Sequence, residues 1–83
     1  MNESRTPTFT VRQVEVVRLI AVGCSNEEVG KRLGISPRTA KAHADTLRQK
    51  LGVPRRRQIP AAYRAVTGDD PLAQGLEPAG LGG

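Results

Sequence analysis

The sequence has few of the residues that stabilise very small domains or build catalytic centres. Its 83 residues include one cysteine, one histidine, one phenylalanine and one tyrosine, and they include no tryptophan. A single cysteine excludes an intrachain disulfide, and one cysteine with one histidine does not make a zinc site. No pairing of a nucleophile with a base and no phosphate-binding loop is visible. The sequence therefore predicts a protein that is not an enzyme and that uses no metal and no cofactor.

Long hydrophobic runs are absent as well. No stretch is apolar enough to cross a membrane, and the first ten residues, MNESRTPTFT, lack the apolar segment of a secretory signal. These two absences predict a cytoplasmic protein without a membrane partner. A chain of this length holds at most one domain.

Positive charge, by contrast, is abundant and unevenly distributed. All 13 lysines and arginines and five of the eight acidic residues lie in residues 1–68, which therefore carry a net charge of +8. This density favours a polyanionic partner such as nucleic acid, although many small domains simply have a solvated basic surface. Residues 69–83 are acidic, rich in glycine and proline and without a hydrophobic period, which predicts a disordered tail. Residues 1–8 are expected to be a flexible N-terminus.

Capping signals divide residues 9–68 into helices. Thr10 and Ser25 each precede a glutamine or a glutamate by three residues, which is the spacing of a capping box. Ser36 followed by Pro37 indicates a third helix start. The glycines placed to end helices are Gly23, Gly34, Gly52 and Gly68.

A fourth helix is less sharply marked than the first three. Pro60 is tolerated only in the first turn of a helix, so we expect this helix to begin near Arg57 or Gln58 and to end at Gly68. No alternating strand pattern is visible. The sequence therefore predicts an all-α fold with four helices over residues 9–68.

The second and third helices are joined by a very short turn that runs from Leu33 to Ser36. Gly34 within this turn permits the left-handed backbone that a sharp angle between two helices requires. Two helices joined in this way form a helix-turn-helix, whose second helix enters the major groove of DNA. We therefore expect the helix from about Ser36 to Leu51 to bind double-stranded DNA.

The expected recognition helix has an apolar stripe and an opposite face suited to reading bases. Ala40, Ala44, Leu47 and Leu51 recur at helical spacing and should face the core. On the other side, lysine and arginine can donate to guanine, glutamine can pair with adenine, aspartate can accept from cytosine N4, and alanine can touch a thymine methyl. The predicted base contacts are Arg38, Lys41, Ala42, Asp45 and Gln49. The alternative is an ordinary amphipathic helix with a solvated face, which the acidic Asp45 favours because phosphates repel a carboxylate.

Phosphate contacts are predicted on one flank of this helix, at its N-terminus and in the basic loop that follows it. Such contacts fix the register of a protein on DNA without reading sequence. For the loop run Arg55-Arg56-Arg57 a solvated surface is an equally good interpretation, and for His43 the alternative is a partly buried, hydrogen-bonded imidazole. The predicted phosphate contacts are Ser36, Thr39, His43, Thr46, Lys50, Arg56 and Arg57.

From Phe9 to about Val66 the sequence resembles the LuxR/FixJ-type, or GerE-type, helix-turn-helix domain of bacterial transcription regulators. The segments that carry the resemblance are FTVR (9–12), EVVRLIA (15–21), SNEEV (25–29), LGISPRTAKAH (33–43) and KLGV (50–53). The resemblance implies a four-helix domain that binds DNA as a dimer. It implies base-reading positions at Lys41, Ala42 and Asp45. It also implies contacts with the DNA backbone at Asn26, Thr39, His43 and Lys50.

The resemblance further implies that the fourth helix makes a homodimer contact. The residues at these positions are Ile59, Ala62, Tyr63 and Val66. Ala40 and Ala44 are smaller than the residues usual at their positions, so looser packing is expected beneath the recognition helix. Two alternatives stay open. One is a sigma-factor-like promoter-binding domain, with RNA polymerase as partner, and the other is a protein-interaction module that uses the fourth helix and the acidic tail.

Overall fold

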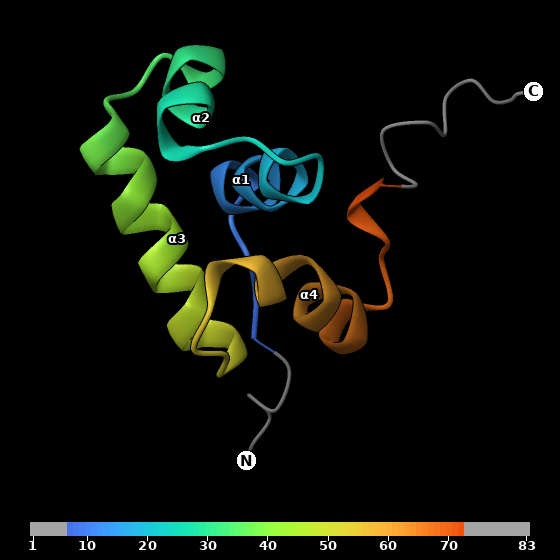
Figure 1. Cartoon of the computed structure of the whole chain (residues 1–83). Coiled ribbons are helices and arrows are strands. Elements are labelled where there is room, and N and C mark those ends of the chain that lie inside the picture. Colours follow the sequence, from blue (N-terminus) through green and yellow to red (C-terminus); the bar gives the residue numbers. More distant parts are fainter. Residues whose placement is uncertain (1–6, 73–83) are drawn as a thin grey trace, which may run out of the picture.

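The computed structural model describes residues 7–72, and every regular element in this range is helical (Figure 1). The elements in chain order are α1 (Val11–Ala21), α2 (Asn26–Leu33), α3 (Pro37–Leu51), the 3-10 turn η2 (Arg56–Gln58) and α4 (Ile59–Thr67). The predicted all-α fold with four helices is confirmed. The predicted flexible N-terminus and disordered tail lie outside the described residues, except for residues 7–8 and 69–72. Within that part of the tail Pro71 is buried.

The first three helices begin at the caps that the sequence predicts. The Thr10 hydroxyl accepts from the backbone N–H of Gln13 at 3.0 Å, and the Gln13 side chain accepts from the N–H of Thr10 at 2.9 Å. Ser25 and Glu28 form the same reciprocal pair at 3.1 and 2.8 Å. The Ser36 hydroxyl accepts from the backbone N–H of Thr39, the third residue of α3, at 3.1 Å. Each cap satisfies backbone donors that a helix start leaves without partners, which fixes where the helix begins.

The start of α4 shows how the chain accommodates a proline. Pro60 is the second residue of α4, within the first turn, where its missing N–H breaks no helical hydrogen bond. The turn η2 precedes it, and the backbone N–H of Gln58 donates to the carbonyl of Arg55 at 3.0 Å. The α-helical part therefore begins at Ile59, just after the predicted start near Arg57 or Gln58.

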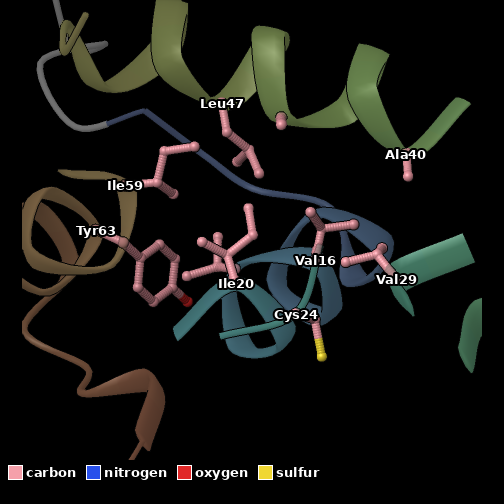
Figure 2. Packing of buried hydrophobic residues seen from close by; sticks show 10 residues of the cluster. Val16, Ile20, Cys24, Val29, Ala40, Leu47, Ile59 and Tyr63 are labelled. Atoms are coloured by element: carbon pink, nitrogen blue, oxygen red, sulfur yellow. The ribbon is translucent and has the colours of Figure 1, made fainter. Parts of the chain in front are cut away.

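The core lies where α1 packs against the other three helices (Figure 2). Tyr63 of α4 meets Phe9 edge-on, with ring centroids 5.1 Å apart. Ala40 and Ala44 are buried despite their small size, so the expected loosening leaves no opening to solvent at these positions. The buried hydrophobic residues are Val16, Val17, Ile20, Cys24, Val29, Ala40, Ala44, Leu47, Ile59 and Tyr63.

Candidate nucleic-acid interface

The corner between α2 and α3 is built by main-chain contact. The carbonyl of Gly30, inside α2, accepts from the N–H of Gly34 and from the N–H of Ile35, the latter at 2.9 Å. A Cβ at position 30 would lie 2.5 Å from the Ile35 carbonyl oxygen, a distance that a real Cβ does not adopt. Glycine at position 30 therefore lets α2 approach the turn. Gly30 is not among the predicted site residues, although a glycine inside an amphipathic helix was a signal available in the sequence.

At the turn itself, the chain changes direction through a left-handed residue. Gly34 has φ 71° and ψ 33°, the conformation that the sequence predicted for this position. Ser36 then caps α3, and its hydroxyl also donates to the Thr39 hydroxyl at 3.0 Å. The N-terminal half of α3 is thus set relative to α2 by the turn, while its outer side is left open (Figure 1).

The outer face of α3 carries the predicted base-reading side chains. The core stripe is confirmed, since Ala40, Ala44 and Leu47 are buried, whereas Leu51 is half-buried. On the opposite side the structure places the predicted base contacts together along one face. Asp45 is half-buried there, and the exposed members are Arg38, Lys41, Ala42 and Gln49.

Asp45 is paired with two cations of the same helix. The Lys41 ammonium donates to Oδ2 of Asp45 at 3.0 Å, and the Arg48 guanidinium donates to Oδ1 at 2.7 Å. A second nitrogen of Arg48 donates to the Pro54 carbonyl at 3.2 Å. The hydrogen bond from Arg48, and then the one from Lys41, lower the pKa of the Asp45 carboxyl. The Asp45 carboxylate therefore stays ionised, and two positive charges of its own helix lie beside it.

Lys50, a predicted phosphate contact, ties the end of α3 to the segment before α1. Its ammonium donates to the Thr8 carbonyl at 2.7 Å and to the Gln13 side-chain oxygen at 3.0 Å. It also lies 5.2 Å from the centroid of the Phe9 ring, within cation–π range. Two of its three N–H groups are therefore engaged inside the domain.

Two other predicted phosphate contacts meet each other. The Arg56 guanidinium donates to the Asn26 side-chain oxygen and to the Cys24 carbonyl, which fastens η2 to the start of α2. Arg57 lies exposed beside this contact. His43 is half-buried on the flank of α3, while Thr39 and Thr46 are exposed.

The predicted dimer contact is divided between the core and the surface. Ile59 is fully buried and Tyr63 is 4% exposed, because both side chains pack inside the domain (Figure 2). Their side chains therefore face the core of the domain, and a dimer contact by these two residues stays a prediction. Ala62 is half-buried and Val66 is exposed, so these two remain on the accessible side of α4.

Within residues 7–72 no helix combines the length and the hydrophobicity that crossing a bilayer requires. The same range contains no cluster of three or more His, Cys, Asp or Glu side chains able to hold a metal ion.

Comparison with known proteins places this arrangement in a family. The family model described as "Bacterial regulatory proteins, luxR family" matches residues 7–61, which include α1, α2, α3 and η2. The chain is 45% identical over 56 residues to Rv0890c of Mycobacterium tuberculosis, whose name places it among the HTH-type transcriptional regulators. It is 41% identical over 51 residues to YhjB of Escherichia coli, named in the same class, and 37% identical over 51 residues to the transcriptional regulatory protein MctR of Rhizobium johnstonii.

These matches cover much of the chain but little of the relatives. They include 68% of the chain for the mycobacterial protein and 61% for each of the other two. They cover only 6%, 26% and 24% of the respective relatives. No solved structure matches the chain significantly.

Proposed function

The chain belongs to the luxR family of bacterial regulatory proteins, and we propose that it is a sequence-specific DNA-binding domain of a bacterial transcription regulator. The observation that carries this proposal is the division of α3 into a buried stripe and an open face. The open face presents Arg38 and Lys41 beside the small Ala42, whereas the stripe is packed in the core. Such a helix can lie in the major groove with its outer face against the base edges.

Phosphate contacts around α3 would fix its register on the duplex. Thr39 and Thr46 are exposed on its flank, and Arg57 is exposed in the following loop. We keep Lys50 in this role because one N–H of its ammonium remains beyond the two engaged inside the domain. We keep His43, Ser36, Asn26 and Arg56 on the same surface as further proposed backbone contacts.

We propose that the protein binds as a homodimer through the accessible side of α4. Ala62 and Val66 offer a small apolar surface there, which suits a symmetric contact between two copies. Two recognition helices related by a two-fold axis would read two half-sites separated by about one helical turn, roughly 10 base pairs. As a bacterial regulator the protein would act in the cytoplasm, with RNA polymerase as a further proposed partner.

The test compares binding to a duplex selected from a random pool with binding to random duplexes, at several salt concentrations. We expect the affinity to fall steeply with salt for both, with the selected duplex bound more tightly throughout. The variant Lys41→Ala should lower the ratio of selected to random affinity by roughly tenfold. The variant Arg57→Ala should weaken both duplexes alike and reduce the salt slope by about one.

Arg64→Gln is the matched control. Arg64 is an exposed arginine on α4, which lies apart from the corner between α2 and α3 (Figure 1). Its loss removes one positive charge without touching the proposed groove-binding face, so the ratio of affinities should stay unchanged. Equal affinity of the unaltered protein for selected and random duplexes would overturn sequence-specific binding. An equal weakening of both duplexes by Lys41→Ala would overturn the assignment of Lys41 to base reading.

A further inference from the structure

Asp45 is the only acidic residue of α3, and both of its carboxylate oxygens already accept a hydrogen bond. A negative charge on a groove-binding face is repelled by phosphates, so it lowers the affinity for any duplex that offers no donor in return. The same charge penalises base edges that present acceptors, such as guanine and thymine at O6 and O4. A single acidic residue on this face therefore lowers the affinity for wrong sequences as well as raising the affinity for a right one.

From this cluster we infer that Asp45 is a specificity-determining residue that selects a cytosine, and that Arg48 is the residue that positions it. The inference rests on the proposed function, since it takes the outer face of α3 to lie in the major groove. Cytosine is the base whose major-groove edge offers the N4 amino donor without an adjacent acceptor on the same base. Adenine presents its N7 acceptor beside its amino group, which a carboxylate disfavours.

Arg48 holds the carboxylate in place from the C-terminal side of α3. Its two terminal nitrogens donate in different directions, one to Oδ1 of Asp45 at 2.7 Å and one to the Pro54 carbonyl at 3.2 Å. Its side chain is 33% exposed, against 66% for Lys41. Because the planar guanidinium is fixed at two points, it orients the carboxylate and does not itself reach the bases.

Lys41 holds the other oxygen only loosely. Its ammonium is a single point donor at the end of a flexible, largely exposed side chain. When Lys41 turns to guanine O6 or N7, Oδ2 of Asp45 loses its hydrogen bond and faces the groove. A cytosine N4–H group then replaces the ammonium as donor to Oδ2. With Lys41 on guanine, Asp45 therefore keeps two hydrogen bonds opposite a cytosine and only one opposite a base that offers no amino donor.

Ala42 makes this readout geometrically possible. It lies three residues before Asp45 on the same exposed face, and its side chain is a single methyl group. A small residue at this point lets the helix backbone approach the base edges closely. The short aspartate side chain can then reach an amino group that it could not reach beneath a longer neighbour.

The experiment is a selection of bound duplexes from a random pool, carried out in parallel with the unaltered protein and four variants. We expect the unaltered protein to select a cytosine at one position of each half-site. Asp45→Ala should lose that preference by roughly tenfold while other positions keep theirs. Asp45→Asn should change the preferred base from cytosine to adenine, because an amide can both accept from N6 and donate to N7.

Two further variants separate positioning from general charge. Arg48→Met keeps the side-chain length but removes the donors, so preference at the cytosine position should weaken while the half-site otherwise persists. Glu15→Ala is the matched control, because Glu15 forms an ion pair with Arg12 at the same spacing on α1 and is 42% exposed, against 38% for Asp45. It should select the unaltered site. Circular dichroism spectra verify that each variant is folded.

Each result distinguishes this inference from the proposed function. A cytosine preference that is lost in Asp45→Ala and becomes adenine in Asp45→Asn supports it. The same site selected by Asp45→Ala and by the unaltered protein overturns it and leaves sequence-specific binding intact. Tighter binding of Asp45→Ala to all duplexes, without a change at any position, also overturns it, since Asp45 would then act only through charge. A failure of the unaltered protein to select any site overturns the proposed function itself.

Discussion

The N-terminal half of α3 meets its neighbours through very small residues, whereas its C-terminal half is held by large ones. Around the turn, Gly30, Ala40 and Ala44 are buried, and the main chains of α2 and the turn are in direct contact. Further along, Leu47 and Ile59 fill the space between α3 and α4. The close approach of α2 to the start of α3 therefore depends on small residues, whereas the C-terminal half of α3 is held by large buried side chains.

The largest loss of stability is expected in the C-terminal half of α3, where the buried side chains are large. Leu47→Ala removes a fully buried side chain and leaves a cavity, so the free energy of unfolding should fall by about 2–5 kcal/mol. Urea denaturation followed by circular dichroism measures this loss. Gln49→Ala, at an exposed position of the same helix, serves as control and should stay within about 0.5 kcal/mol. A loss below about 1 kcal/mol for Leu47→Ala would contradict the division between the two halves.

A smaller change in the free energy of unfolding is expected for Gly30→Ala, and its sign tests the close approach of α2 to the turn. In a helix interior, glycine to alanine ordinarily stabilises by about 0.5–1 kcal/mol. Here the added Cβ would lie 2.5 Å from the Ile35 carbonyl oxygen, so we expect Gly30→Ala to destabilise by about 1–3 kcal/mol. DNA affinity should fall as well, because relief of the clash moves the start of α3. Lys31→Ala, at the exposed neighbouring position, is the control, and a stabilised Gly30→Ala protein would refute the close approach.

The smallest loss of stability is expected from removing one helix cap, either at the start of α1 or at the start of α3. Ser36→Ala and Thr10→Ala each remove a side-chain acceptor for a helix N–H, so each should cost about 1 kcal/mol in thermal or urea unfolding. Only Ser36 lies at the start of α3 and contacts Thr39, so Ser36→Ala alone should also weaken DNA binding. Equal DNA affinity of the two variants would show that the start of α3 plays no part in the interface.

What could be predicted from the sequence was local. Thr10, Ser25 and Ser36 mark helix starts within three residues of their partners, and helical spacing alone assigned Ala40, Ala44 and Leu47 to the core. The family resemblance then supplied the proposed roles along the outer face. These features need no knowledge of how distant segments meet.

What could not be predicted depends on contacts between distant segments. Lys50 donates to Thr8 across 42 residues, and Arg56 contacts Asn26 across 30. No local pattern distinguishes cations that bind distant parts of the domain from cations that contact only solvent. The burial of Ile59 and Tyr63 likewise follows from how α4 docks on α1 and α3, which decides the apolar positions that face inward.

The attachment of Lys50 also has a mechanical consequence. The Lys50 ammonium, near the C-terminal end of α3, contacts the Thr8 carbonyl and the Phe9 ring. The same ammonium donates to the Gln13 side chain of α1. One side chain therefore joins three places: the segment before α1, α1 itself and the C-terminal end of α3. Loss of the Lys50 ammonium would therefore detach the segment before α1 from the proposed recognition helix in a single step.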